Sequence, residues 1–333
     1  MPDTPPDVPA PGAVPLGLIG GTGRSGTTAL RDALARHPDV LAFPELRFAI
    51  DPDGLVDTYR AFEAGWSPFH ADVRLRRLEA LLAAVADDAP GTLPGRVARK
   101  LGLGERLGRV PVPAYTGHRA VDVCPTFRER ARQLIDALTD YTYAGAWTGT
   151  PGGARAEVRV GGPYDREALA ETLGGFWRAV AADSLAHAGR SFFLDKQTWS
   201  ILWVDAILDL LPSARLVHVV RDPRDIAASY TSMGWGPSRP ADAARLVADV
   251  LDRWAEVRDR VPADRVLEVR LEALAAAPEP SLREVCDFLG IEWHEAVLAF
   301  DLSRVNAGRW RGALDDEAHA TLAPHVAAYG YGG

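Results

Sequence analysis

Cysteine is scarce in this sequence, and so are long apolar runs. The only two cysteines, Cys124 and Cys286, lie far apart and without the spacing of a metal site. A disulfide framework is therefore not expected, and two buried thiols in a reducing compartment, the cytoplasm, are the simpler interpretation. No apolar segment approaches the roughly 18 residues that a membrane-spanning helix needs. The sequence therefore predicts a cytoplasmic protein that is not embedded in a membrane.

An excess of positive charge is also missing. The 45 acidic residues outnumber the 37 basic ones, which gives a net charge of −8. Proteins that bind nucleic acid usually carry a basic excess, so no nucleic-acid partner is expected. Residues 1–15 contain no lysine or arginine and include six prolines. A signal peptide would begin with basic residues, and we therefore predict a disordered, proline-rich leader over 1–15.

Lysine is nearly absent. Of the 37 basic residues only Lys100 and Lys196 are lysines, and the other 35 are arginines. Arginine and lysine differ chemically: lysine is a compact charge on a flexible stem that can donate a proton, whereas arginine keeps its proton. A lysine in a chain that otherwise uses arginine is therefore a candidate for chemistry.

Short apolar segments recur along the chain and alternate with segments of helical spacing. Strands are predicted at 16–20, 191–194, 215–220 and 266–269. Helices are predicted at 29–36, 167–187 and 241–260. This alternation is typical of a parallel sheet that is covered on both faces. The sequence therefore predicts an α/β fold with a P-loop-like parallel sheet flanked by helices on both faces.

Residues 54–163 interrupt the alternation. The segment is rich in glycine and proline, and 145–162 has the composition of a loop. We interpret it as a helical and loop insertion within a single domain of residues 16–333. Open α/β sheets bind ligands at the carboxyl ends of their strands, so we expect the insertion to lie over the active site, on the acceptor side.

A glycine-rich turn follows the first predicted strand, with the sequence Gly21-Thr22-Gly23-Arg24-Ser25-Gly26-Thr27-Thr28. It fits the nucleotide-binding pattern G-x-x-x-x-G-K-[ST], except that Thr27 replaces the lysine. Such glycines let backbone N–H groups surround an anion, and the following helix N-terminus adds partial positive charge. The missing lysine would reach the β- and γ-phosphates of a triphosphate. The loop therefore favours a ligand with a terminal anion but no γ-phosphate, although a plain strand–turn–helix junction is the alternative.

A second anion site is predicted where the strand at 215–220 ends. Arg221 follows that strand directly, and Ser229 lies two turns along the helix that begins near Pro223. The guanidinium of Arg221 can bind a phosphate with two hydrogen bonds, and the Ser229 hydroxyl can donate a third. The alternative is that Arg221-Asp222 and Arg224-Asp225 are surface ion pairs that contribute little.

Together the two segments resemble the sulfotransferase superfamily that uses 3′-phosphoadenosine-5′-phosphosulfate (PAPS). The branch concerned contains the Golgi carbohydrate and protein-tyrosine enzymes and many bacterial homologues. Further segments match in the right order: His37-Pro38-Asp39-Val40, Leu211-Pro212-Ser213-Ala214, Val269-Arg270-Leu271-Glu272-Ala273-Leu274, Phe288-Leu289-Gly290-Ile291, Asn306-Ala307-Gly308-Arg309-Trp310-Arg311 and Tyr329-Gly330-Tyr331. The resemblance covers most of the chain, and only the insertion carries no match.

The resemblance implies a PAPS-dependent sulfotransferase that moves a sulfuryl group to an acceptor hydroxyl by in-line displacement, leaving adenosine-3′,5′-bisphosphate (PAP). Its first loop, Gly23, Arg24, Ser25, Gly26, Thr27 and Thr28, would hold the 5′-phosphosulfate. Arg221 and Ser229 would hold the 3′-phosphate, and Gly308, Arg309, Trp310 and Arg311 would close on the phosphates. Where relatives often have a tyrosine, this chain has Leu271, so the contact of that tyrosine is missing.

Three residues are predicted to carry the chemistry. Glu45 is the candidate base for the acceptor hydroxyl, because relatives place a glutamate in this region; pairing with Arg47 is the alternative. Lys196 would donate to the bridging oxygen as charge develops on the leaving group. Arg24 would share that charge. His70, His118 and Asp122, within the insertion, are runner-up bases.

Two other functions compete with this one. A small-molecule P-loop kinase would need the loop lysine, which Thr27 replaces. A non-catalytic nucleotide-binding protein would tolerate loss of Glu45 or Lys196, and both are present. No metal site is expected. We expect a small hydroxylated acceptor, such as a natural product or glycoside, for which Trp147, Trp177, Trp235 and Tyr143 are candidate lining residues; aromatic packing in the core is the alternative for these four. The sequence does not indicate the oligomeric state.

Overall fold

The structure is a computed structural model, and it describes residues 14–87, 118–145, 156–302 and 307–332. The predicted leader at 1–15 lies almost wholly outside these ranges. The chain divides into two compact units. The first unit contains the segment up to Ala42, Gly189–Leu202 and the segment from Ser213 onward. The second contains Phe43–Ala188 and Trp203–Pro212.

The first unit is built on a five-stranded sheet with strand order β2-β5-β1-β6-β7. In chain order the strands are β1 (Leu16–Gly21), β2 (Val40–Phe43), β5 (Phe192–Lys196), β6 (Arg215–Val220) and β7 (Val266–Arg270). The central strand β1 pairs in parallel with β5 and β6, and β6 pairs in parallel with β7. The four predicted strands are confirmed to within two residues at each end. The four-residue strand β2, which directly follows Pro38 and Asp39, was not predicted.

Helices cover both faces of this sheet, as predicted. Along β6 the side chains alternate, so Val217 and Val219 join one buried cluster while His218 points to the other face. That cluster is completed by α1 (Thr27–Leu34), α11 (Leu271–Ala276), α12 (Pro278–Leu289) and the short helix η4 (Glu295–Ala299). On the opposite face the His218 ring lies 4.8 Å, between centroids, from Trp254 of α10 (Pro240–Arg258). Another short helix, η3 (Ala263–Arg265), precedes β7.

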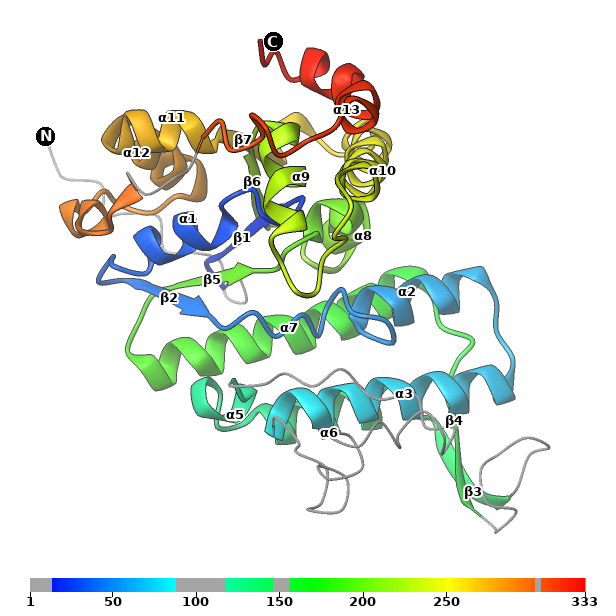
Figure 1. The fold of residues 1–333 in the computed structure, drawn as a ribbon. Helices are drawn as coiled ribbons and strands as arrows, with labels where there is room; N and C mark the ends of the chain where they lie inside the picture. Colours follow the sequence, from blue (N-terminus) through cyan, green and yellow to red (C-terminus); the bar gives the residue numbers. More distant parts are fainter. Residues whose placement is uncertain (1–13, 88–117, 146–155, 303–306, 333) are drawn as a thin grey trace, which may run out of the picture. The chain divides into compact units, whose positions relative to one another are not determined.

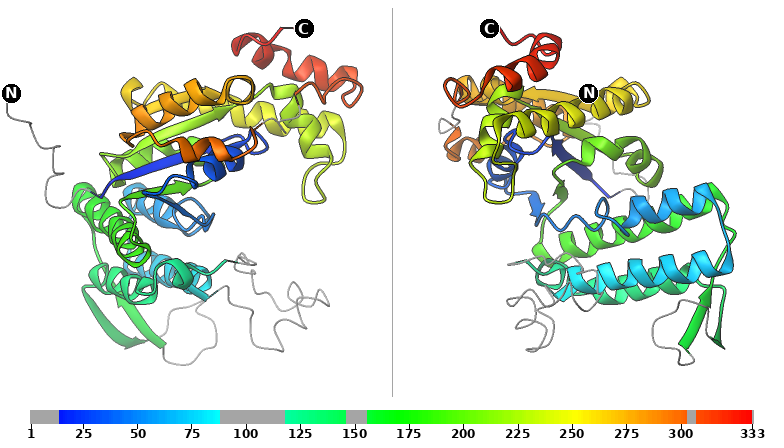
Figure 2. Two further views of the ribbon diagram at one scale, coloured as in Figure 1. Left: turned by 90° about the vertical axis from the view of Figure 1, so that its left-hand side faces the viewer. Right: turned by 45° about the vertical axis from the view of Figure 1, so that its right-hand side comes forward.

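A separate apolar cluster joins three helices that follow β6 and end the chain. They are α9 (Pro223–Thr231), α10 and α13 (Asp316–Ala328). Ile226 and Tyr230 of α9 pack with Val247 of α10 and Leu322 of α13. Both views of Figure 2 show α10 and α13 side by side, in yellow and red. The C-terminal helix is thereby fixed to the helix that follows the second predicted anion site.

The second unit is mainly helical. Its helices are α2 (Leu55–Ala64), α3 (Pro68–Asp87), α5 (Ala120–Val123), α6 (Phe127–Ala137), α7 (Arg166–Ala188) and α8 (Val204–Leu210), and η2 (Ser200–Trp203) leads into α8. The long helices α3, α6 and α7 pack beside one another (Figure 1). Phe48 lies at the centre of their aromatic core, with its ring centroid 5.9 Å from those of Phe127 and Phe176 and 5.7 Å from that of Trp177. The unit is wider than the predicted insertion, because it also takes in α7 and α8.

Part of the predicted loop at 145–162 is a strand. Ala156–Val160 forms strand β4, which pairs antiparallel with β3 (Tyr141–Gly145). The prediction of a loop was wrong for β4, because the glycines and the arginine beside this five-residue strand are typical of loops. The backbone N–H of Arg159 in β4 donates to the buried Asp72 of α3 at 2.9 Å. This hairpin is therefore fastened to a helix at its β4 edge.

Both cysteines are buried and form no disulfide, which confirms the prediction of two buried thiols. Burial raises the pKa of Cys124, and burial raises the pKa of Cys286 to about 11. Since the thiolate is the reactive form, neither side chain is a reactive nucleophile.

Candidate active site

The turn after β1 has the conformation of an anion-binding loop. Gly23, Arg24 and Gly26 all have positive φ angles, of 76°, 56° and 99°. Gly26 is the N-cap of α1 and, within the described residues, gives this helix no side-chain cap. The first N–H groups of a helix have no partner inside the helix, so an uncapped start can receive an anion. Thr27 is buried at the first position of α1, where the P-loop pattern has its lysine.

Two aromatic side chains hold the loop in this shape. The carbonyl of Thr22 accepts hydrogen bonds from Tyr230 Oη (2.9 Å) and from Trp199 Nε1 (3.0 Å). A Cβ atom on Gly23 would lie 2.2 Å from Tyr230 Oη, so only glycine fits at this position. Trp199 itself has a φ of 71°, which is an unusual conformation for a bulky residue. Neither aromatic residue was predicted to act here, since the sequence gives no sign that they converge on Thr22.

Ser25 is a further sign of a ligand. Its hydroxyl oxygen is fully buried and has no hydrogen-bond partner among the described residues. Buried polar groups are nearly always satisfied, so an unpaired hydroxyl in a glycine-rich loop is suited to a bound anion.

The structure brings the two predicted anion sites together. Arg24 Nε donates to Ser229 Oγ at 3.0 Å, and Arg221 Nη1 donates to the carbonyl of Arg24 at 2.9 Å. Burial is the main cause that lowers the pKa of Arg221; the carboxylates of Asp225 and Glu272 raise this pKa, and the charges of Arg24 and Arg309 lower it. Arg24, Arg221 and Ser229 thus form one cluster, in which two guanidinium groups meet where the two predicted anion sites join.

The alternative of surface ion pairs at this point is not what the structure shows. Asp222 caps α9 by accepting the N–H of Arg224 at 2.9 Å, and its carboxylate pairs with the Arg224 guanidinium at 2.8 Å. Asp225 lies 3.9 Å from Arg221. Each of the four side chains is at most 10% exposed. The ion pairs are thus buried. They join Arg224 with Asp222 and Arg221 with Asp225, and not the arginine and aspartate that are adjacent in the sequence.

The loop at 307–311 reaches the same cluster. The carboxylate of Asp225 accepts the backbone N–H groups of Gly308 (2.7 Å) and Trp310 (3.1 Å). The guanidinium of Arg224 lies 4.0 Å from the centroid of the Trp310 ring, and that of Arg311 lies 4.8 Å from it. Asn306 lies outside the described residues. Sequence reasoning quoted Asp225 within a motif but assigned it no role.

Lys196 lies at the carboxyl end of β5, opposite Ile19 of β1. The segment after it runs beside the start of the loop: Gln197 N donates to the Ile19 carbonyl, and Trp199 N donates to the Gly21 carbonyl, both at 3.0 Å. Lys196 is 5% exposed. Lysines usually lie at the protein surface, whereas Lys196 is buried on the strand next to the glycine-rich turn.

The candidate bases all belong to the second unit. Glu45, two residues after the end of β2, is partly exposed, and Arg47 contacts Asp51 at 3.2 Å. Both ring nitrogens of His70 form hydrogen bonds: Nδ1 donates to the Gly65 carbonyl, and Nε2 accepts from Arg74.

The other two runner-up bases are exposed. Asp122 pairs with Arg119, and this hydrogen bond lowers the pKa of its carboxyl. His118 is exposed as well. A lowered pKa makes Asp122 a weaker base, which leaves Glu45 as the preferred candidate.

Leu271 occupies the position of the family tyrosine. It is 3% exposed, belongs to the core cluster beneath the sheet, and its methyl groups would lie 2.4 and 2.7 Å from a Cβ on Gly26. It therefore supports the glycine-rich turn by packing, and it offers no hydroxyl.

Of the candidate acceptor-lining residues, Trp177 packs in the core and lines no acceptor pocket. It is fully buried in the aromatic core around Phe48. Tyr143 and Trp235 are exposed, at 41% and 65%, and Trp147 lies outside the described residues.

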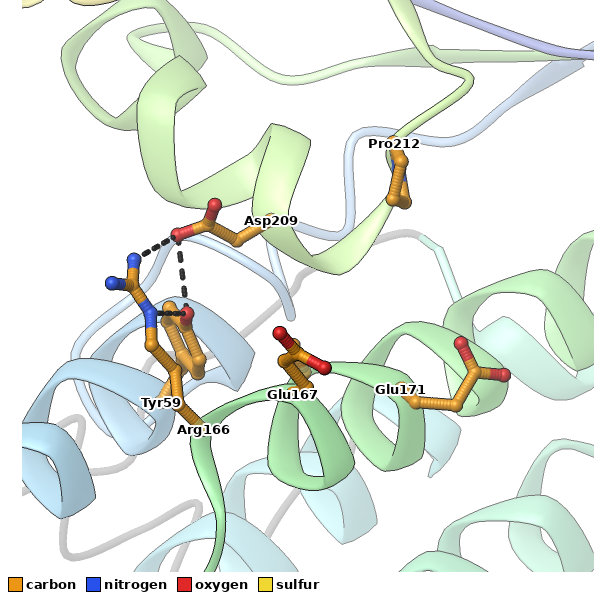
Figure 3. A pocket seen from close by; sticks show the side chains of 7 residues that line it. Tyr59, Arg166, Glu167, Glu171, Asp209 and Pro212 are labelled. Atoms are coloured by element: carbon orange, nitrogen blue, oxygen red, sulfur yellow. Dashed lines mark hydrogen bonds and ion pairs between the residues drawn. The ribbon is translucent and has the colours of Figure 1, made fainter.

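The second unit contains a surface pocket of about 450 Å³ (Figure 3). Tyr59 Oη donates to Asp209 at 3.1 Å, and Arg166 donates to both, at 2.9 Å each. Arg166 also pairs with Glu63 at 2.8 Å. Arg166 is thus paired with two carboxylates, and Glu167 and Glu171 also line the pocket.

Comparison with known proteins decides the family. The sequence profile described as "Sulfotransferase family" matches residues 15–295. The chain belongs to the sulfotransferase family. This sulfotransferase matches none of the curated proteins searched.

Several solved structures are similar at low identity. The sulfotransferase domain of the Synechococcus olefin synthase is 20% identical, with a TM-score of 0.44, covering 90% of this chain and 80% of the other. A sulfotransferase of Mycobacterium avium is 16% identical, with a TM-score of 0.45 and coverages of 96% and 77%. A sulfotransferase of Alicyclobacillus acidocaldarius is 16% identical, with a TM-score of 0.41 and coverages of 95% and 93%.

Within the described ranges, no group of three or more His, Cys, Asp and Glu side chains is arranged to hold a metal ion. Likewise, none of the helices described is long and apolar enough to cross a membrane.

Proposed function

We propose that this sulfotransferase takes its sulfuryl group from PAPS and transfers it to the hydroxyl of a small-molecule acceptor by in-line displacement. The observation that carries the choice of donor is the contact of Arg24 with Ser229 beside Arg221, next to the glycine-rich turn. Such a cluster suits a ligand with phosphate groups at two positions. A triphosphate, in contrast, needs a loop lysine, where this chain has Thr27.

The residues present fit this donor. The unpaired, buried Ser25 hydroxyl and the uncapped start of α1 can receive a 5′-terminal anion. Arg221, Ser229 and Arg309 can receive the 3′-phosphate, whose charge would relieve the repulsion among the arginines. Gly23, with no room for a Cβ, keeps the loop in the shape that presents its backbone to the ligand.

When bound, PAPS would supply the activated sulfuryl group. Lys196, held at the end of β5, would stabilise the negative charge that develops on the departing phosphate and can donate a proton to it. Arg24 would share that charge. Glu45 would accept the proton of the acceptor hydroxyl, which makes the acceptor oxygen a better nucleophile.

Ligand binding tests the donor most directly. We expect PAP at millimolar concentration to raise the melting temperature of the purified chain by several degrees, because only the folded state binds it. ATP with Mg²⁺ and adenosine-5′-monophosphate serve as matched ligands that lack the 3′-phosphate, and neither should give the same shift. Stabilisation by ATP and Mg²⁺ alone would favour a P-loop kinase instead.

Turnover tests the rest of the proposal. Incubation with labelled PAPS and a panel of hydroxylated acceptors, including phenols, alcohols, glycosides and steroids, should transfer label to at least one class. Binding of PAP with no transfer to any acceptor and no slow hydrolysis of PAPS would favour a non-catalytic nucleotide-binding protein.

A further inference from the structure

Asp225 is a buried carboxylate to which the proposed chemistry gives no part. It lies in the first turn of α9 and is 1% exposed. Its Oδ2 accepts the N–H of Gly308 at 2.7 Å, and its Oδ1 accepts the N–H of Trp310 at 3.1 Å. Both carboxylate oxygens are thus used to hold one short stretch of backbone.

The same stretch has a second attachment. The Trp310 ring packs under the Arg224 guanidinium at 4.0 Å, and its edge meets His319 of α13 at 5.5 Å between centroids. Arg224 is fixed in turn by Asp222, with which it forms hydrogen bonds from Nε at 3.0 Å and from Nη2 at 2.8 Å. The backbone is therefore attached on both sides of Arg309, at Gly308 and at Trp310.

Arg309 is the residue between these attachments, and it is exposed. Besides burial, the positive charge of Arg309, like that of Arg24, lowers the pKa of the buried Arg221. Arg24 donates to Ser229 Oγ at 3.0 Å, and the attachments of Gly308 and Trp310 place the Arg309 backbone beside Asp225, whose carboxylate lies 3.9 Å from Arg221. Like charges repel one another, so Arg309 would move away unless its backbone were held. The hydrogen bonds to Asp225, together with the packing of Trp310 on Arg224, hold this backbone in place.

We propose that Asp225 is a positioning residue for donor binding: it holds the Gly308 and Trp310 N–H groups and so keeps Arg309 beside Arg221 and Ser229. The inference rests on the proposed function, because the ligand of this cluster is taken to be the 3′-phosphate of the donor. It adds a residue that neither touches the ligand nor takes part in the chemistry.

Asp225→Asn tests the proposal because two effects of this change oppose each other. Removal of a negative charge beside three arginines favours the binding of an anion. Loss of the carboxylate, however, leaves one acceptor oxygen and an amide NH₂ that faces a backbone N–H, so one attachment is broken. Hydrogen bonds to charged groups are the stronger kind. We therefore expect the Kd for PAP, measured by calorimetry, to rise about tenfold or more.

The matched control is Asp242→Asn, which removes the same charge from the first turn of the neighbouring helix α10. Asp242 pairs only loosely with the exposed Arg239, at 3.9 Å. This variant should bind PAP like the wild type. An unchanged or lower Kd for Asp225→Asn would overturn the proposal, because it would show that Asp225 acts only as a counter-charge.

Kinetics and hydrogen exchange separate positioning from a general loss of stability. In Asp225→Asn the KM for PAPS should rise about tenfold while kcat at saturation changes little, and exchange at 307–313 should become faster without a change in the β-sheet. In the Arg309→Ala background, Asp225→Asn should add little, since the residue that it positions is gone. Full additivity of the two changes would contradict the proposal.

Two results keep failure of this inference apart from failure of the proposed function. If the wild type does not bind PAP at all, the proposed donor is wrong. If the wild type binds PAP but Arg309→Ala binds it equally well, the donor stands and the role of Asp225 falls. Arg309 is exposed, so this variant should fold even if Asp225→Asn does not. PAP should also slow exchange at 307–313 in the wild type, and no slowing would count against the proposal.

Discussion

Two charged clusters of this sulfotransferase, one in each unit, differ in how far they are buried. At the β6–α9 junction of the first unit, the side chains of Arg221, Asp222, Arg224 and Asp225 are all at most 10% exposed. In the pocket of the second unit, the side chains of Asp209 and Arg166 are 41% and 64% exposed (Figure 3). Burial of charge is costly and is tolerated only with close partners, whereas exposed pairs cost and contribute little. The buried charges at the β6–α9 junction are suited to a bound ligand, whereas the exposed charges of the pocket interact with water.

Glycine shows the same contrast. In the first unit Gly23 has a φ of 76°, and a Cβ would meet Tyr230. In the second unit Gly175 lies inside α7 with its nearest neighbour, the end of the Arg178 side chain, at 3.7 Å from an added Cβ. One glycine is required by the shape of the loop, and the other is only a weak point in a helix.

The largest effect is expected for Asp222→Ala. The change removes the cap of α9 and leaves the Arg224 guanidinium buried without its carboxylate. Loss of one partner of a buried pair typically costs about 3–5 kcal/mol. Urea denaturation should show the free energy of unfolding falling by this amount. A loss below about 1 kcal/mol would mean that this pair behaves like an exposed one.

Lys196→Ala should reduce kcat by about 100- to 1000-fold, the range seen when one group that stabilises transition-state charge is removed. The Kd for PAP should change by only a few-fold, because the phosphates retain their arginines. Lys196→Arg is the control that keeps the charge but replaces the compact ammonium, and we expect it to recover only part of the rate. Unreduced turnover in Lys196→Ala would disprove the role of this lysine.

Gly23→Ala and Gly175→Ala should have opposite signs. Forcing alanine into the left-handed conformation beside Tyr230 should destabilise the protein by about 1–3 kcal/mol and weaken PAP binding. Alanine at position 175 of α7 should stabilise it by about 0.5–1 kcal/mol, since glycine is a poor helix former. Thermal melting of both variants, with and without PAP, measures the two effects. The same sign in both would contradict the contrast drawn here.

Asp209→Asn should have the smallest effect. Its carboxylate is well exposed, so the free energy of unfolding should change by less than about 1 kcal/mol, and activity should remain. The measurement is urea denaturation at low and at high salt, where any difference from wild type should shrink as salt screens the charges. A loss as large as that of Asp222→Ala would remove the distinction between the two units.

The sequence predicted well those features that depend on local pattern. The strand 215–220 was found at its true ends, because one leucine and three valines within six residues before Arg221 leave few alternatives. The turn at 21–28 was found because glycine spacing after a strand is a local signal. The hairpin of β3 and β4 was missed, since its strands are held by Asp72 and by each other rather than by an apolar pattern.

By itself, the sequence determined the parallel α/β fold, the glycine-rich turn without its lysine, and the resemblance to the family that the match at 15–295 confirms. Only the tertiary structure decided which side chains meet. Arg24 reaches Ser229 across 205 positions, and Asp225 reaches Gly308 across 83. Tyr230 and Trp199 converge on one carbonyl from different elements. Hydrogen-bond partners depend on distance in space, and residue spacing along the chain fixes that distance only within a single strand or helix.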